Sequence, residues 1–191
     1  ILGLDVNHFS SELIIWNSKG VIVFNLSEKK IKIDFKIDNI TSAKFIPNTN
    51  KYIFCSNKYF YYFNSNQVFD SIQLIDSWSL METNENSIIA SGYNRIIEIN
   101  NAGINILDLP DVGLIWVAQK INGTFLLGTS EGKLFSVKNV NKIIKEMKMP
   151  QGINNIEVID KNKILFNCEN GQLMEFDLRL KKTTKITLFL I

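Results

Sequence analysis

The stretch KYIFCSNKYFYYFN, residues 51–64, reads as an apolar strand, a polar turn and a second apolar strand, which is the pattern of a β-hairpin. Four other stretches align with it without gaps: ELIIWNSKGVIVFN at 12–25, SIIASGYNRIIEIN at 87–100, FLLGTSEGKLFSVK at 125–138 and ILFNCENGQLMEFD at 164–177. Their starting points lie 39, 36, 38 and 39 residues apart. A hairpin that recurs about every 38 residues indicates a repeat architecture.

Each hairpin is flanked by two further apolar segments. A short strand is expected about eleven residues before each hairpin, beginning at Ile1, Ile40, Ile75, Leu114 and Ile153. A fourth strand follows each hairpin and is clearest at residues 30–37, where charged and apolar side chains alternate. The lysines of that segment are typical of an outer edge strand, because charge there discourages pairing with another chain. Residues 140–149 occupy the same position in the fourth unit, and we expect a strand there as well.

Five four-stranded units predict an all-β fold, a β-propeller built from antiparallel blades. A small sheet cannot bury both of its faces alone, so such units are stable only when stacked against neighbours. The expected blades span approximately residues 1–38, 39–75, 76–112, 113–151 and 152–190 of a single domain or fragment. Because the chain opens on Ile1 and closes on an apolar run, we expect it to be part of something longer.

The segment ITSAKFIPNTNKYIFCSNKYFYYFN, residues 40–64, resembles the WD-repeat family in its order of inner strand, proline turn and two further strands. The resemblance covers the whole chain, but its motifs are degenerate. The dipeptides that match the closing Trp-Asp are Phe24-Asn25, Phe63-Asn64, Ile99-Asn100, Val137-Lys138 and Phe176-Asp177. The family's Gly-His pair is absent, since the only histidine, His8, follows an inner strand.

The number of blades in the complete ring is left open by the sequence. Propellers of the WD-repeat family usually have about seven blades, so the resemblance implies about two further blades. A closed ring of five blades is the alternative, because five turns of the repeat cover nearly the whole chain.

The balance of basic and acidic residues does not indicate a class of binding partner. With 21 basic and 19 acidic residues, the chain lacks the basic surface typical of nucleic-acid-binding proteins. Its apolar runs are far shorter than the roughly 18 residues that span a bilayer. Cys55 and Cys168 lie in blades that are not neighbours, so we expect buried free thiols and an intracellular, cytoplasmic or nuclear location.

The sequence predicts no catalytic, metal or cofactor site. A serine or cysteine nucleophile needs a base, usually histidine, and His8 alone lies on an expected surface turn. Two distant cysteines and one histidine do not make a zinc site, and no glycine-rich loop leads into a helix that could hold phosphate. We therefore expect a protein that is not an enzyme and shows no small-molecule site.

Ligands are expected at the ends of a propeller, because its blade faces are buried and its loops vary. Aromatic and arginine side chains are enriched at interfaces. The predicted partner-binding residues at the hairpin-turn end are Lys58, Tyr59, Trp78, Tyr93, Arg95 and Lys133. The same end is expected to carry Lys19 and Gln172, with Asp111 near a link between blades.

Three functions remain open at this stage. The leading hypothesis is a non-catalytic protein-interaction scaffold within a larger complex, which binds a protein or peptide. The second is a ligand-sensing propeller that binds a sugar or cofactor in a central pocket. The third is an RNA-binding part of a ribonucleoprotein, against which the net charge of +2 argues.

Overall fold

A computed structural model of the chain describes residues 2–8, 10–49, 51–63, 69–77, 80–83, 87–139, 142–149, 151–179 and 182–186. Within these ranges the chain forms twenty β-strands and no helix. Successive groups of four strands form five separate antiparallel sheets, each in simple sequential order. The structure thus confirms the predicted all-β fold of antiparallel quartets.

The first two sheets, called blades one and two, contain β1 to β8. Blade one consists of β1 (Gly3–Asn7), β2 (Glu12–Asn17), β3 (Gly20–Asn25) and β4 (Lys30–Lys36). Blade two consists of β5 (Ile40–Phe45), β6 (Tyr52–Ser56), β7 (Tyr59–Phe63) and β8 (Phe69–Gln73).

The remaining twelve strands make up blades three to five. Blade three consists of β9 (Leu80–Glu82), β10 (Ile88–Gly92), β11 (Arg95–Asn100) and β12 (Gly103–Asp108). Blade four consists of β13 (Ile115–Ile121), β14 (Thr124–Thr129), β15 (Lys133–Asn139) and β16 (Lys142–Lys148). Blade five consists of β17 (Ile153–Asp160), β18 (Lys163–Cys168), β19 (Leu173–Asp177) and β20 (Lys182–Ile186).

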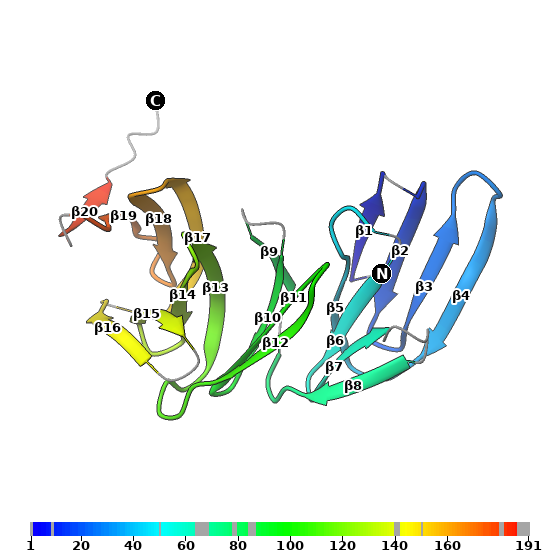
Figure 1. Ribbon diagram of the computed structural model, residues 1–191, viewed down its shortest axis with the longest axis horizontal. Coiled ribbons are helices and arrows are strands. Elements are labelled where there is room, and N and C mark those ends of the chain that lie inside the picture. The colour runs from blue at the N-terminus through cyan, green and yellow to red at the C-terminus, as the bar shows by residue number, and fades with distance from the viewer. Residues whose placement is uncertain are drawn as a thin grey trace.

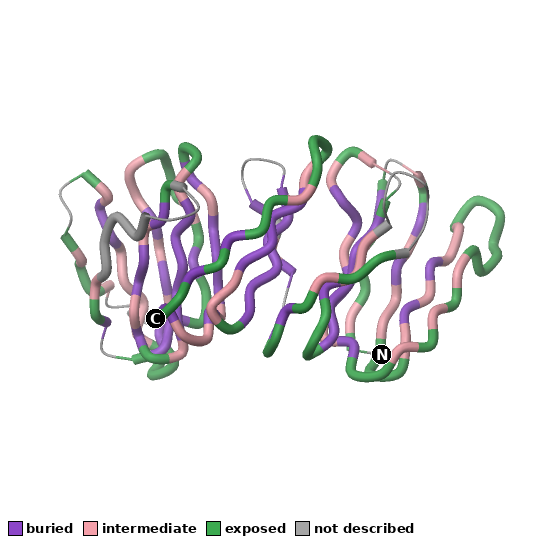
Figure 2. The backbone as a smooth tube through the Cα atoms, turned by 60° about the horizontal axis from the view of Figure 1, so that its bottom comes forward, coloured by how far each residue is buried: buried purple, intermediate pink, exposed green. Residues whose placement is uncertain are grey.

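The five blades follow one another around an open arc (Figure 1). The first strand of each blade lies toward the inner side of the arc, and the fourth strand lies toward its outer rim. Blades one and five stand at opposite ends of the arc, so the closed ring of five blades is not observed. Buried residues concentrate in the middle of the strands and exposed residues at the turns (Figure 2).

Four apolar clusters hold the arc together, one between each pair of neighbouring blades. Blades three and four, for example, share a cluster that includes Ile89, Ile96, Val112, Leu127 and Phe135. Adjacent residues of one strand belong to different clusters, because side chains alternate between the two faces of a sheet. The blade interfaces are therefore the core of the molecule.

Strand β10 shows most directly how adjacent residues of one strand belong to different clusters. Ile88 and Ala90 pack toward blade two, whereas Ile89 between them packs toward blade four. All three side chains are fully buried. Burying apolar surface stabilises the fold by roughly 25 cal/mol per Å². A strand that is buried on both faces therefore has apolar side chains at consecutive positions and not at alternate ones.

The outward face of blade one is the exception. Leu4, Val6 and Ile31 are among its exposed apolar side chains, whereas Ile14 and Val23 face blade two and are fully buried. Apolar side chains therefore occupy both faces of blade one, although only one face is covered in the described structure.

Side chains at three of the five positions that match the family's closing aspartate cap the turn between the third and fourth strands. Asn25 Oδ1 accepts the backbone N–H of Glu28 at 2.7 Å, and Asp177 Oδ1 accepts that of Arg179 at 2.8 Å. Asn100 Oδ1 accepts the N–H of Ala102 at 2.8 Å. Without a histidine partner, these oxygens form the local turns for which Asn and Asp are favoured.

Some strand boundaries differ from the prediction, and the hairpin turns use glycine and asparagine in different ways. The inner strand of blade three begins at Leu80 and not at Ile75, because Ile75 lies in the exposed link between blades two and three. Asn94 and Gly132 adopt the positive φ expected of hairpin turns. Gly20 does not; a Cβ there would lie 2.1 Å from the carbonyl oxygen of Phe35, so close approach of β4 requires glycine.

Candidate functional site

One end of the molecule is formed by the hairpin turns between second and third strands together with the links between blades. Backbone hydrogen bonds join each turn to a neighbouring link along this end, which we call the turn end. The donor and acceptor pairs are Asn39–Ser18, Asn57–Asn39, Tyr93–Ile75, Ser130–Leu114 and Glu169–Gly152. This continuous bonding fixes the backbone from which exposed side chains project.

Tyr93 is held on both sides within this network. Its N–H donates to the carbonyl of Ile75 at 2.8 Å, and its backbone also pairs with Leu114 in an isolated antiparallel bridge. The next residue, Asn94, adopts φ 54° and accepts the N–H of Gly113 on its side-chain oxygen at 2.6 Å. The side chain of Tyr93 is nevertheless 52% exposed, so a fixed backbone presents an aromatic ring to solvent.

Arg95 lies next to this tyrosine and is engaged by its own neighbours. Its Nε donates to Asp108 Oδ1 at 2.5 Å, and its Nη1 donates to the backbone carbonyl of Gln73 at 2.8 Å. Gln73 ends β8 of blade two and Asp108 ends β12 of blade three. The guanidinium therefore joins two blades and has its charge balanced by a carboxylate.

A shallow cavity of about 200 Å³ opens between blades two and three at this point. We call its lining the Tyr93 patch, which consists of Gln73, Ile75, Tyr93, Asn94, Arg95 and Asp108. The volume lies below the roughly 300–1,000 Å³ of pockets that enclose small molecules. The geometry therefore fits one or two side chains of a larger partner better than a whole ligand.

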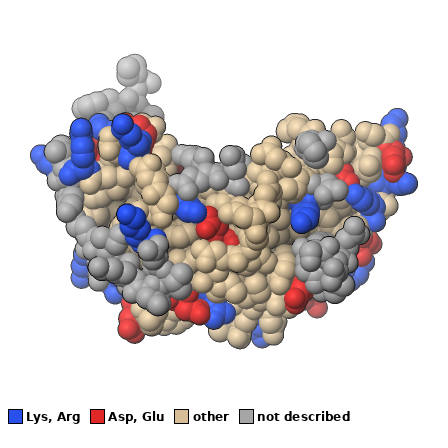
Figure 3. Space-filling view, in the orientation of Figure 1, with Lys and Arg blue, Asp and Glu red and all other residues tan. Residues whose placement is uncertain are grey.

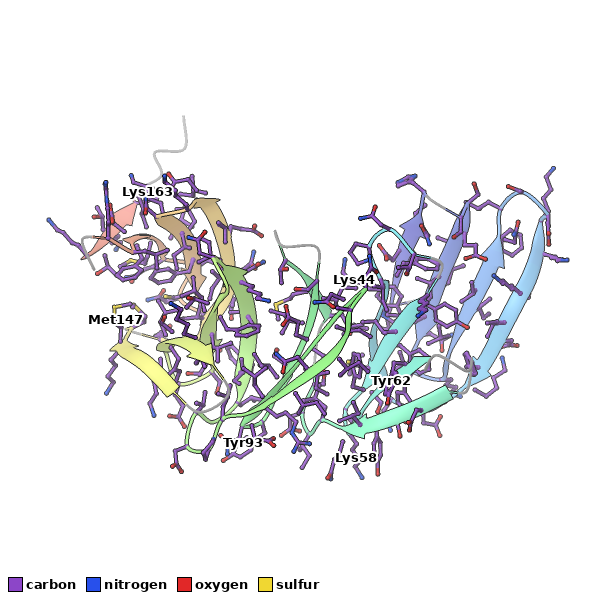
Figure 4. The ribbon with its side chains drawn as sticks, viewed as in Figure 1. Lys44, Lys58, Tyr62, Tyr93, Met147 and Lys163 are labelled. Carbon is purple, nitrogen blue, oxygen red and sulfur yellow. The ribbon has the colours of Figure 1, made fainter. Side chains whose placement is uncertain are left out.

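Four other residues were predicted to bind a partner: Lys58, Tyr59, Lys133 and Trp78. Tyr59 is exposed and pairs with Gln73 across β7 and β8, and Lys58 precedes it in the turn. Figure 4 shows Lys58 and Tyr93 along the same end of the molecule. Lys133 belongs to the blade-four hairpin and pairs with Glu131 at 3.2 Å. Trp78 lies outside the described residues.

Sequence reasoning missed four members of the Tyr93 patch: Gln73, Ile75, Asn94 and Asp108. Ile75 had been assigned to an inner strand. Gln73 and Asp108 are the last residues of fourth strands, which antiparallel order places at the turn end. The antiparallel order of the strands could have identified them, because the fourth strand of a blade ends beside the turn where its third strand begins.

Two observations concern the reactive side chains of the described residues. No group of three or more His, Cys, Asp or Glu side chains among them could hold a metal ion. Cys55 is fully buried, and burial raises the pKa of its thiol to about 12. A thiol with a raised pKa stays protonated at neutral pH and is a poor nucleophile.

Comparisons with known proteins identify the fold but no relative by sequence. No family model matches the chain, and no curated protein matches it. A chain in the crystal structure of the mitotic checkpoint complex superposes with a TM-score of 0.69 at 9% sequence identity. The match covers 94% of this chain and 62% of that chain, so the present chain spans about three fifths of its length.

Together with the five four-stranded sheets, this likeness identifies a WD-repeat-like β-propeller. At 9% identity the likeness concerns the fold alone. Among the described residues, no helix has the length and apolar character needed to cross a membrane.

Proposed function

We propose that this chain is a non-catalytic protein-interaction scaffold and that its partner docks on the turn end at the Tyr93 patch. The observation that carries the proposal is the half-exposed ring of Tyr93 on a backbone bonded to two links. Rigid aromatic side chains give large contact area at a small loss of conformational entropy, and tyrosine and arginine are enriched among interface anchors.

Neighbouring side chains support the same interpretation. Ile75 is 48% exposed beside Tyr93, and Tyr59 is exposed on the neighbouring blade. Three large apolar or aromatic side chains thus emerge on adjacent segments of the turn end. An apolar centre within a polar rim is typical of protein interfaces.

The structural likeness supports a partner within an assembly. The protein whose chain superposes on this one was crystallised as part of the mitotic checkpoint complex. A role in a larger complex, in an intracellular compartment, is therefore part of the proposal. The alternatives remain a ligand-sensing propeller and an RNA-binding one. The small cavity argues against the first and the nearly balanced charge against the second.

Site-specific photo-cross-linking tests the proposal. The photoreactive amino acid p-benzoylphenylalanine replaces Tyr93 in one variant and Lys19, on the blade-one hairpin of the same end, in a control variant. We expect position 93 to cross-link a defined protein in cells and unmodified chain to compete for it, whereas position 19 does not capture that protein. Equal capture at both positions, or none at position 93, would contradict the proposal.

A further inference from the structure

The basic residues at the turn end suggest at first an acidic partner, but the structure shows that two of them, Arg95 and Lys133, are already paired with carboxylates. Arg95 donates to Asp108 and to the carbonyl of Gln73. Lys133 pairs with Glu131 in its own hairpin. An acidic peptide would have to displace these contacts, which lowers the affinity that it gains from them.

Two further carboxylates lie in the links on either side of the Tyr93 patch. Asp76 follows Ile75 in one link, and Asp111 lies two residues before Gly113 in the other. Both are exposed, and no hydrogen bond or ion pair from either side chain is found among the described residues. Arg95 and Asp108 balance each other, so the exposed carboxylates of Asp76 and Asp111 add negative charge to the two links that flank the patch.

Asp108 and Tyr93 add two features that favour a cation. The Asp108 side chain is 65% exposed, and only its Oδ1 is bonded to Arg95 in the described structure. Its other oxygen is available to accept a hydrogen bond from an ammonium or guanidinium group. The exposed ring of Tyr93 has a negative π face that attracts cations.

Ile75 supplies the apolar part of the site. Tyr93 and Ile75 are joined by a backbone hydrogen bond, and Gly92 lets the chain approach this closely, since a Cβ at Gly92 would lie 2.4 Å from the Ile75 carbonyl oxygen. Both side chains line the same cavity of about 200 Å³. An aliphatic side chain inserted between them would be shielded from water on two sides.

Building on the proposed function, we propose that the Tyr93 patch selects a protein segment in which an aliphatic anchor side chain is flanked by lysine or arginine. The anchor packs between Ile75 and Tyr93. The flanking cations contact Asp76, Asp108 and Asp111 around it. Specificity then comes from carboxylates that repel an acidic segment as well as attract a basic one.

Two fluorescein-labelled peptides test this inference with the purified chain. One has the sequence Gly-Lys-Leu-Lys-Gly and the other Gly-Glu-Leu-Glu-Gly, with both ends blocked so that they differ only in the flanking charges. At low salt we expect the basic peptide to bind at least about threefold to fivefold more tightly by fluorescence anisotropy. The preference should shrink at about 0.5 M salt, because exposed charges are then screened.

A matched pair of variants locates the effect. The D76N/D111N variant removes two carboxylates beside the patch and keeps side chains that tolerate positive φ, which both positions adopt. It should lose most of the charge preference. The control E131Q/E169Q removes two carboxylates from hairpins of blades four and five at the same end and should keep it.

The outcomes separate the inference from the proposed function. Equal binding of both peptides, tighter binding of the acidic peptide, or no binding of either at millimolar concentration overturns the inference. A persistent preference in D76N/D111N also overturns it, since the charges would then act elsewhere. None of these results bears on whether position 93 cross-links a protein partner, which tests the proposed function by itself.

Discussion

Glu98 and Lys120 form an ion pair of 2.7 Å between blade three and blade four, and both side chains are largely buried, with exposed fractions of 4% and 18%. Glu98 lies on β11 and Lys120 on β13. The ammonium of Lys120 also lies 5.2 Å from the centre of the Phe125 ring. An ion pair between opposite charges thus joins two blades that also share an apolar cluster.

Removing one partner of this pair should cost more than removing both. The E98A variant leaves Lys120 as a poorly solvated charge, so we expect it to lower the free energy of unfolding by about 3 kcal/mol. The double variant E98L/K120M replaces both charges with apolar groups and should be the more stable of the two. Urea denaturation measures both values, and a double variant less stable than E98A would contradict this account of the pair.

Cys55 should make stability depend on alkaline pH. Burial raises the pKa of its thiol from 9.0 to about 12 in the folded chain. The neutral thiol therefore contributes stability that is fully present below pH 9 and is lost as the pH rises toward 12, by about 1.4 kcal/mol per pH unit within that window.

The C55A variant provides the measurement. Its unfolding free energy should fall less steeply above pH 9 than that of the wild type, and the difference between the two slopes reports the thiol alone. In addition, Cys55 should react with a thiol reagent only after unfolding. Parallel pH profiles, or rapid labelling of Cys55 in the native chain, would rule out the buried thiol.

The two faces of blade one should respond differently to truncation. Ile14 is fully buried against blade two, whereas Leu4 on the outward face is 61% exposed. We expect I14A to cost about 2–5 kcal/mol and L4A to change stability by less than about 0.5 kcal/mol. Thermal or urea unfolding of both variants measures these two losses of stability. A large loss for L4A would show that the outward face is covered in solution.

Gly92 links the fold to the Tyr93 patch. An added Cβ would collide with the carbonyl oxygen of Ile75, a backbone atom that cannot move without shifting the link. G92A should therefore destabilise the chain by about 1–3 kcal/mol and weaken binding of the basic peptide. The A90G variant, two residues earlier in the same strand, serves as a control that should destabilise without displacing Ile75. Equal peptide binding by G92A and the wild type would mean that the link does not position the site.

The strands were predictable because their cause is local. Two-sided burial leaves every residue of β6 and β10 buried and most of them apolar, and recurrence of the pattern every 36 to 39 residues indicates the repeated sheets. Ile75 shows where this reasoning fails. Its apolar side chain resembles the start of a strand, but the link that contains it passes over Tyr93, and only the backbone hydrogen bond between them reveals this.

The residue types of the candidate site could be chosen from the sequence, but its local charge could not. Tyr59, Tyr93 and Arg95 were identified by their places in or beside hairpin turns. Sequence spacing does not show that Asp108, thirteen residues from Arg95, pairs with its guanidinium. On the face shown in Figure 3, basic and acidic side chains form small separate groups on a surface made mostly of other residues. The net charge of the whole chain therefore says little about the electrostatic potential at one site.

The affinity of the partner captured at position 93 tests the central claim most directly. Binding to the wild-type chain, to Y93A and to K19A is compared by calorimetry, after circular dichroism has shown that both variants fold. Loss of an aromatic anchor at the centre of an interface should weaken binding about thirtyfold, whereas loss of the exposed Lys19 side chain should leave it nearly unchanged. If Y93A binds as tightly as the wild type, the partner docks elsewhere and the Tyr93 patch is not its site.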